Sequence, residues 1–123
     1  MGNPKTILVV EDNHLTRKVV RIALKTEGYT VLEAPDGRCA LELMAERLPD
    51  LVLQDLMLPD VDGFELLKRL RSMPGGMDVP ILAFSAFVGK LEEARKLKLG
   101  FAGYIAKPIE PSQLIKAIRP YFA

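Results

Sequence analysis

Cysteine, histidine and tryptophan are scarce in this chain of 123 residues, which has one cysteine, one histidine and no tryptophan. The lone cysteine, Cys39, cannot form an internal disulfide, and the helical pattern around it predicts a buried small apolar side chain rather than a reactive thiol. The lone histidine, His14, has no thiol or second histidine near it, which argues against a soft-metal site and predicts a surface position at the start of a helix.

An excess of one charge and long apolar runs are also absent. Seventeen basic and sixteen acidic residues give a net charge of +1, without the basic block or stripe that binds nucleic acid or an anionic membrane. No apolar run approaches the roughly 18 residues that cross a bilayer, and the N-terminus lacks a basic stretch followed by a long apolar one. We therefore expect no direct nucleic-acid partner, no membrane partner, and a location in the reducing cytoplasm.

The sequence does contain enough apolar residues for one core. The chain is 49% apolar, so we expect a single domain over residues 1–123, with a core of about 5–121. Five short runs predict strands, and those at 7–10, 51–53 and 80–84 are apolar throughout, as in central parallel strands that are covered on both faces. The other two predicted strands span 30–32 and 103–106.

Stretches with helical spacing separate these strands and predict five helices, each with one apolar face and a polar opposite side. Glycine or proline follows each of the first four and ends the helix, because glycine accepts left-handed dihedrals and proline cannot continue the ladder. Strict alternation implies an α/β fold, a doubly wound flavodoxin-like (βα)5 sandwich of three layers with a parallel five-stranded sheet in the order 2-1-3-4-5. The predicted faces are Leu15, Val19, Ile22 and Ala23; Ala40, Leu41, Met44 and Leu48; Phe64, Leu67 and Leu70; Leu91, Ala94 and Leu97; and Leu114, Ile115 and Ile118, with helix ends at Gly28, Pro49, 74–76 and Gly100.

Polar residues stand at the carboxyl ends of the first, third, fourth and fifth predicted strands. In a sheet of this order, ligands bind beyond those ends, where the strand order reverses between the first and third strands. The polar groups are therefore predicted to converge on one cleft. They are Glu11 and Asp12 after the first strand, Gln54 and Asp55 on the third, Ser85 on the fourth and Lys107 on the fifth.

Three carboxylates in one cleft would repel and raise one another's pKa, and a single lysine cannot offset them. Oxygen ligands without histidine or cysteine select a hard ion such as Mg²⁺, which also accepts phosphate as a ligand. We expect Mg²⁺ on Asp12 and Asp55, with Glu11 acting through water. With the Ser85 hydroxyl and the Lys107 ammonium nearby, Asp55 is predicted to attack phosphorus and form an aspartyl phosphate.

Four motifs carry a resemblance to a known family. They are VVEDN at 9–13, LVLQDLMLPDVDGFEL at 51–66, PILAFSA at 80–86 and GYIAKPIEPSQL at 103–114. With them, the chain from Lys5 to Tyr121 resembles the receiver domains of two-component response regulators. The match therefore extends over essentially the whole sequence.

The resemblance implies specific roles for residues of these motifs. Asp55 would be the phosphoacceptor, the backbone carbonyl of Met57 would complete the metal shell, and the peptide between Lys107 and Pro108 would be cis, which X-Pro bonds tolerate. It further implies Glu11 and Asp12 as the acidic pair, Ser85 as the catalytic and switch hydroxyl, Tyr104 as the switch aromatic and Lys107 as the catalytic cation.

The same resemblance implies a conformational switch. Ser85 would move toward the phosphoryl oxygen and let Tyr104 turn inward, which would remodel the surface of the fourth helix, fifth strand and fifth helix. Lys90, Lys96 and Phe101 are candidate parts of that surface. We expect a monomer, or a phosphorylation-dependent dimer formed through it.

Two features depart from commoner members of the family. Glu11 stands where aspartate is frequent, and Met57 and Phe87 are apolar at positions two residues beyond the acceptor and the switch hydroxyl. As a hypothesis, Met57 and Phe87 hinder an attacking water and lengthen the life of the aspartyl phosphate, whereas the small Ala86 admits the phosphoryl donor.

Several residues near the acids also have structural explanations. Asp12 or Asn13 could cap the first helix and complement its dipole, and Asp62 is predicted to cap the third. The residues predicted to shape the turn before that helix, rather than to contact phosphate, are Pro59, Asp60 and Gly63.

The sequence thus predicts a phosphoacceptor domain that takes a phosphoryl group from the phosphohistidine of a histidine kinase or phosphotransfer protein and signals to a downstream protein target. We do not expect a multiple-turnover enzyme on an external substrate. Three alternatives remain: a receiver that belongs to a longer hybrid histidine kinase or regulator, a pseudo-receiver that binds partners without phosphorylation, and a Mg²⁺-dependent phosphatase. A phosphatase of the last kind would resemble proteins that carry their aspartate nucleophile in a DxD pair after the first strand, whereas this chain has Glu11-Asp12 there.

Overall fold

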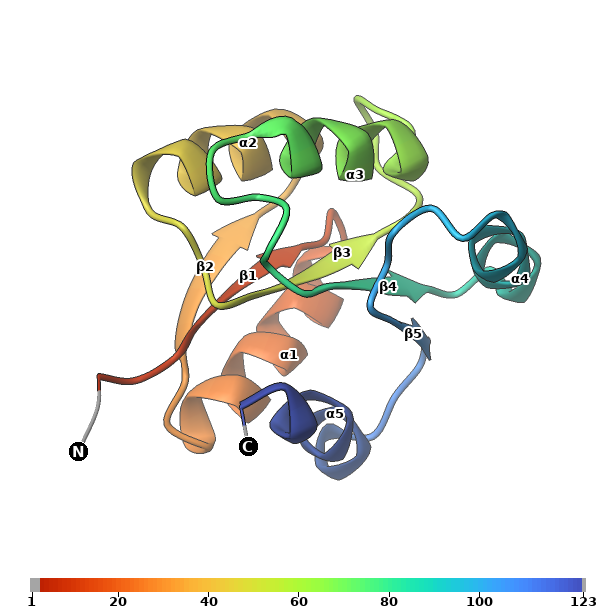
Figure 1. Ribbon diagram of the computed structural model, residues 1–123. Helices are drawn as coiled ribbons and strands as arrows, with labels where there is room; N and C mark the ends of the chain where they lie inside the picture. The colour runs from red at the N-terminus through yellow and green to blue at the C-terminus, as the bar shows by residue number, and fades with distance from the viewer. Residues whose placement is uncertain (1–2, 123) are drawn as a thin grey trace.

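The computed structural model describes residues 3–122, which form one parallel five-stranded sheet between two layers of helices (Figure 1). The elements are β1 (Thr6–Val10), α1 (His14–Thr26), β2 (Thr30–Ala34), α2 (Gly37–Glu46), β3 (Leu51–Asp55), α3 (Gly63–Ser72), β4 (Ile81–Ser85), α4 (Val88–Leu97), β5 (Gly103–Ala106) and α5 (Pro111–Ile118), followed by a 3₁₀ turn at Arg119–Phe122. The strand order is β2-β1-β3-β4-β5, and every pair is parallel. The predicted doubly wound flavodoxin-like fold is therefore confirmed.

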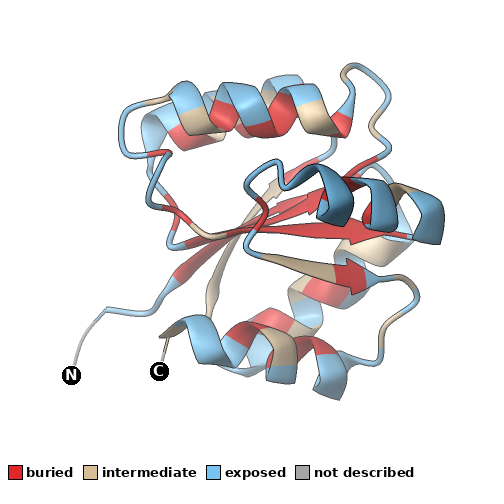
Figure 2. Cartoon of the chain, turned by 45° about the vertical axis from the view of Figure 1, so that its right-hand side comes forward, coloured by how far each residue is buried: buried red, intermediate tan, exposed pale blue. Residues whose placement is uncertain are grey.

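The sheet separates two apolar clusters. Helices α1 and α5 bury their apolar residues against one face, and α2, α3 and α4 bury theirs against the other. Every residue of β1, β3 and β4 is buried, whereas β2 and β5 at the edges are only partly covered (Figure 2). This is the burial expected of parallel strands that are covered by crossover helices on both sides.

Helix α1 packs on a different face from the one predicted. Leu15, Val19 and Ile22 are exposed, by 70%, 53% and 53%, while Val20 and Leu24 are buried against the sheet. The helix carries two apolar stripes, and a 3.6-residue period alone does not tell which of them faces the core. The predicted inner face is thus mostly an apolar strip on the surface.

Other predicted positions also differ from the structure. Leu48 lies beyond the end of α2 and is exposed, because the proline that follows disfavours helical dihedrals at that residue. Leu97 is exposed in the last turn of α4. Phe101, predicted as part of the signalling surface, is only 8% exposed because it packs into the core. Cys39 is half-buried, and burial raises the pKa of its thiol, as expected of an unreactive cysteine.

The position of His14 and the length of the helices test two further predictions. His14 is exposed as the first residue of α1, as predicted. Within residues 3–122, no helix combines the length and apolar character that crossing a membrane requires.

Candidate phosphoacceptor site

The three predicted carboxylates lie together at the carboxyl edge of the sheet. Val10 of β1 pairs with Gln54 of β3, so the residues that follow them, Glu11 and Asp55, come side by side. Asp12 is next along the chain. Carboxylate oxygens of Glu11, Asp12 and Asp55 lie within 4.8 Å of one another. The parallel register therefore brings residues 44 positions apart into one acidic cluster.

Lys107 at the end of β5 reaches into this cluster. Its Nζ donates to Oδ2 of Asp55 at 2.9 Å and also contacts Oε1 of Glu11. The other Glu11 oxygen accepts from the backbone N–H of Asn13 at 2.9 Å. The peptide between Lys107 and Pro108 is cis, as predicted. One ammonium thus bridges two of the three carboxylates.

Burial governs the protonation of these groups. The Glu11 side chain is fully buried, which raises the pKa of its carboxyl from 4.5 to about 7, although the hydrogen bonds from Lys107 and Asn13 act in the opposite direction. Burial alone favours the neutral amine of Lys107, but its hydrogen bonds with Glu11 and Asp55 outweigh that effect and raise its pKa. Lys107 therefore remains a cation, while Glu11 titrates near neutral pH.

Asp55 is held at the base of a cleft of about 630 Å³. Only 4% of this residue is exposed, and its Oδ1 accepts from the backbone N–H of Met57 at 3.0 Å. Met57 and Phe87 line the mouth of the cleft with exposed fractions of 44% and 54%. Apolar residues therefore form part of the cleft's lining, and they also include Leu15, Val19, Ala86, Pro108 and Ile109.

Ser85 occupies the end of β4 beside these groups. It is fully buried, and its Oγ accepts from the backbone N–H of Phe87 at 3.0 Å. Its carbonyl accepts from the backbone N–H of Lys107 at 2.9 Å, so the hydroxyl and the ammonium come from adjacent, hydrogen-bonded strands. All the predicted polar groups except Gln54 thus gather at one edge of the sheet.

Tyr104 lies on β5 away from the carboxylates and is half-buried. The Arg95 guanidinium of α4 lies 4.5 Å from the centre of its ring, and the Phe101 ring meets it edge-on at 6.1 Å. A cation over an aromatic face is attractive, so Arg95 favours the observed position of Tyr104. Of the other predicted surface residues, Lys96 is exposed, and Lys90 pairs with Glu93 at 3.8 Å.

Two helix caps explain further polar residues near the site. The side chain of Asn13, not that of Asp12, caps α1 by accepting from a backbone N–H of its first turn. This leaves the carboxylate of Asp12 free for the acidic cluster. Asp62 caps α3 by accepting from the N–H of Phe64 at 2.9 Å, which confirms that prediction.

The loop between β3 and α3 is held by Asp60 and by close packing at Gly63. The carboxylate of Asp60 accepts from the N–H groups of Gly37 and Arg38 at 2.9 and 3.0 Å, and these bonds lower its pKa. A Cβ on Gly63 would lie 2.6 Å from the Cα of Leu56. Asp60 and Gly63 thus shape the loop, as predicted, and do not enter the cleft.

Two polar residues, one buried and one partly buried, make contacts that the sequence does not predict. Gln54 does not face the cleft, because its side-chain amide donates to the carbonyl of Gly63 at 2.7 Å. Arg17 of α1 donates to the backbone carbonyl of Glu11 at 2.9 Å and pairs with Glu33 of β2 at 3.3 Å. No local pattern signals these contacts, since each joins residues that the fold brings together.

The donor set of the cluster fits a hard divalent cation. All three side chains offer carboxylate oxygens, and neither histidine nor cysteine lies among the residues that form the cluster. Among residues 3–122, Lys107 is the one basic side chain that forms ion pairs with these carboxylates. Mg²⁺ prefers such ligands and retains several waters of its own.

Comparisons with known proteins agree with this geometry. The family model described as the response regulator receiver domain matches residues 7–119. The polar-differentiation response regulator DivK of Brucella anthropi is 37% identical over 118 residues, which cover 96% of each chain. The alignment therefore spans nearly all of both proteins.

Solved structures give the same result. The chemotaxis response regulator CheY4 of Vibrio cholerae superimposes with a TM-score of 0.86 at 28% identity, over 96% of this chain and 98% of that one. The receiver domain of sensor histidine kinase PA1611 from Pseudomonas aeruginosa gives 0.85 at 31% identity, over 96% and 97%, and its structure has a magnesium ion coordinated in the active-site cleft. The acidic cluster, the fold and these similarities lead to one conclusion: the chain belongs to the response regulator receiver domain family.

Proposed function

We propose that this receiver domain accepts a phosphoryl group on Asp55 from the phosphohistidine of a histidine kinase or phosphotransfer protein. The observation that carries the proposal is the position of Asp55, whose carboxylate lies at the base of the cleft beside two other acids and the Lys107 ammonium. In the reaction, a carboxylate oxygen of Asp55 bonds to phosphorus as the bond from phosphorus to the donor's imidazole nitrogen breaks. The electron pair of that bond stays on the imidazole.

The neighbouring residues hold the phosphoryl group and a metal. Asp12, Asp55 and the carbonyl of Met57 would hold Mg²⁺, with Glu11 acting through water, and the bound ion would neutralise charge on the phosphoryl oxygens. The ammonium of Lys107 and the hydroxyl of Ser85 pair with the other oxygens. The domain thus carries out its own modification and dephosphorylation, and it is not a multiple-turnover enzyme on an external substrate.

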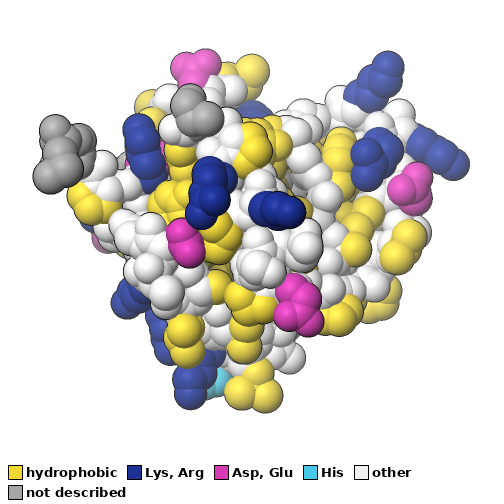
Figure 3. Space-filling view, turned by 90° about the horizontal axis from the view of Figure 1, so that it is seen from below, with side chains coloured by type: hydrophobic (Ala, Val, Ile, Leu, Met, Phe, Trp, Pro, Cys, Tyr) yellow, Lys and Arg dark blue, Asp and Glu magenta, His cyan; other side chains and the backbone are white. Residues whose placement is uncertain are grey.

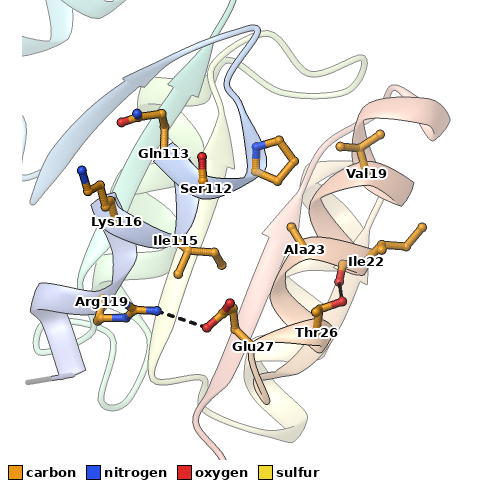
Figure 4. A pocket seen from close by; sticks show the side chains of 11 residues that line it. Val19, Ile22, Ala23, Thr26, Glu27, Ser112, Gln113, Ile115, Lys116 and Arg119 are labelled. Carbon is orange, nitrogen blue, oxygen red and sulfur yellow. Dashed lines mark hydrogen bonds and ion pairs between the residues drawn. The ribbon is translucent and has the colours of Figure 1, made fainter.

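The donor protein docks over the apolar strip on α1. Leu15 and Val19 line the phosphoacceptor cleft, and Val19 and Ile22 line a groove of about 700 Å³ between α1 and α5. Figure 4 shows Val19 and Ile22 of α1 across the groove from Ile115 of α5. Val19 therefore borders both the cleft that contains Asp55 and the groove between α1 and α5.

The charged residues around this strip indicate which kind of donor surface would bind there. Seen from the side of α1 and α5, apolar side chains lie among basic and some acidic ones (Figure 3). We expect an apolar helical surface with an acidic rim on the donor, and Ile22→Glu should slow transfer from a phosphohistidine protein more than transfer from acetyl phosphate. The exposed basic residues on α1, on α5 and at the start of the 3₁₀ turn include Lys18, Lys25, Lys116 and Arg119, the last paired with Glu27 at 3.1 Å.

Phosphorylation is signalled through Ser85 and Tyr104. Ser85 moves toward the phosphoryl oxygen, and Tyr104 turns from its place under Arg95 into the space that is vacated. This remodels the face formed by α4, β5 and α5, which includes Lys90 and Lys96, for a downstream protein target or a second copy of the chain. Met57 and Phe87 at the mouth of the cleft hinder water and prolong the phosphorylated state, while the small Ala86 leaves room for the donor.

The set of acids, hydroxyl and lysine in this chain favours the proposed function over two alternatives. A pseudo-receiver would lack an acid, the hydroxyl or the lysine, whereas this chain has all of these at the carboxyl edge of the sheet. A phosphatase of the DxD type would have its nucleophile after β1, whereas the most enclosed aspartate here ends β3. Similarity to DivK and to the receiver of a sensor histidine kinase supports a cytoplasmic signalling role, either alone or as part of a longer protein.

The test is incubation with Mg²⁺ and acetyl phosphate, followed by intact mass spectrometry of the wild type and of Asp55→Asn. We expect one phosphoryl adduct on the wild type, none on the variant, and no adduct when Mg²⁺ is removed with EDTA. Beryllofluoride should bind the wild type alone. A phosphoryl adduct that persists in Asp55→Asn, or a wild type that reacts with neither reagent, would overturn the proposal.

A further inference from the structure

One arginine of α1 reaches the backbone of the acidic pair. Nη1 of Arg17 donates to the carbonyl oxygen of Glu11 at 2.9 Å, and its Nε lies 3.3 Å from a carboxylate oxygen of Glu33. The Arg17 side chain is only 16% exposed. Its guanidinium therefore connects three parts of the fold, because it belongs to α1, pairs with β2 and bonds to the residue that follows β1.

This bond fixes the direction in which Asp12 leaves the strand. The carbonyl of Glu11 and the N–H of Asp12 belong to one planar peptide unit, so holding the carbonyl orients the start of Asp12. The N–H of Glu11 is fixed as well, since it donates to the carbonyl of Ala34 at 2.9 Å. Both backbone groups of Glu11 are thus restrained.

Asp12 has few other restraints. Its side chain is exposed, and within residues 3–122 it makes no hydrogen bond or ion pair, whereas Glu11 and Asp55 are each held by Lys107 and by a backbone N–H. The place of the Asp12 carboxylate in the cluster therefore depends on its backbone.

We propose that Arg17 is a positioning residue for the metal site: it holds the peptide between Glu11 and Asp12, so that the Asp12 carboxylate lies within reach of Asp55. Glu33 in turn holds the guanidinium. This inference rests on the proposed function, because it assumes that the acidic cluster binds Mg²⁺. It adds a residue of α1 that touches neither the metal nor phosphate.

Whether the removal of Arg17 strengthens or weakens Mg²⁺ binding distinguishes a positioning role from an effect of its charge alone. A positive charge beside three carboxylates repels a divalent cation, so removing an arginine that acted only through charge would strengthen Mg²⁺ binding. Removing one that holds a ligand would weaken it, and loss of the partners that orient metal ligands typically costs 10- to 100-fold in affinity. The two roles therefore predict opposite outcomes.

Arg21 supplies a matched control. It lies one turn further along α1 and pairs with the same carboxylate, that of Glu33, at 3.0 Å, but it has no contact with Glu11. Arg17→Met and Arg21→Met each remove one positive charge and one ion pair to Glu33. Only the first removes the bond to the Glu11 carbonyl.

The experiment is a Mg²⁺ titration of the wild type and both variants, followed by chemical shifts of the backbone amides. We expect Arg17→Met to weaken Mg²⁺ binding about tenfold and Arg21→Met to change it less than about twofold. The rate with acetyl phosphate should fall in Arg17→Met at low Mg²⁺ and recover at saturating Mg²⁺. Unchanged or tighter binding by Arg17→Met, or equal weakening in both variants, would refute the positioning role.

Folding and the proposed function are controlled separately. Circular dichroism establishes that each protein is folded at the temperature of the titration, and if Arg17→Met does not fold, Arg17→Lys and Arg21→Lys replace the pair. Lysine keeps the charge but replaces the planar guanidinium, whose Nη1 and Nε reach Glu11 and Glu33, with a single nitrogen on a flexible stem, so Arg17→Lys alone should weaken Mg²⁺ binding. A wild type that binds no Mg²⁺ would contradict the proposed function, whereas a wild type that binds it with no effect of Arg17 would contradict only this inference.

Discussion

Replacing the buried acid Glu11 with glutamine should raise the stability of the protein relative to the wild type as the pH rises. The pKa of Glu11 is about 7 in the folded protein, against an ordinary value of 4.5, because the side chain is buried. The folded state thus binds this proton more tightly than the unfolded state does. The contribution of Glu11 to the free energy of unfolding therefore falls between these two pH values and levels off above the higher one.

The size of the effect follows from linkage. Each unit of pKa shift corresponds to about 1.4 kcal/mol, so the contribution of Glu11 should decrease by about 2 to 3 kcal/mol between roughly pH 5 and pH 8. Glutamine has no such titration, and Lys107 keeps its bond to Asp55 in the variant. The stability of Glu11→Gln relative to the wild type should rise by that amount over the same interval.

Urea unfolding followed by circular dichroism, in EDTA and at both pH values, measures this difference. Comparing the change in the variant with that in the wild type cancels the titration of groups that do not interact with Glu11. Glu42→Gln is the control, since the Glu42 side chain is 61% exposed and its replacement should produce almost no pH-dependent difference. If the gap between Glu11→Gln and the wild type is the same at both pH values, the reasoning about burial is wrong.

Three further predictions test the site and the loop beside it. The apparent Mg²⁺ affinity of the wild type, measured by amide chemical shifts, should rise about tenfold between roughly pH 6 and pH 8, because the metal competes with the proton on Glu11, and Glu11→Gln should lack this dependence. Met57→Asn combined with Phe87→Glu should shorten the lifetime of the phosphoryl adduct about tenfold, or ~1.4 kcal/mol of barrier, as followed by intact mass, and an unchanged or longer lifetime would refute the role of these two apolar side chains. Gly63→Ala should lower the free energy of unfolding in urea by about 1 to 3 kcal/mol, because its Cβ would lie 2.6 Å from the backbone of Leu56, and a variant as stable as the wild type would contradict that packing.

The sequence predicts the sheet and the cluster well, because both depend on order along the chain. Continuous apolar runs indicate buried parallel strands, and once the strands are ordered, the residues after their carboxyl ends must meet. Glu11, Asp55 and Lys107 were therefore predictable as neighbours. The cap at Asp62 was equally local, since it requires only a short polar side chain before a helix.

Contacts that depend on orientation were not predictable in this way. Helix α1 is apolar on two sides, so its period could not tell Val20, which is buried, from Val19, which is exposed. Gln54 stands beside the acceptor in sequence, yet alternation along the strand turns it toward α3. No local pattern marks Arg17, because its partners lie on β2 and at the residue that follows β1.

The hydrogen bond between the backbone of Ser85 and that of Lys107 joins the tips of β4 and β5. Tyr104 lies on β5, whose Ala106 pairs with Ser85, so the proposed switch residue is close along the strand to the residues that border the acidic cluster. The exposed side chains of α4 and α5 could therefore be redesigned to bind a different partner protein without changing any residue of the proposed phosphoacceptor site.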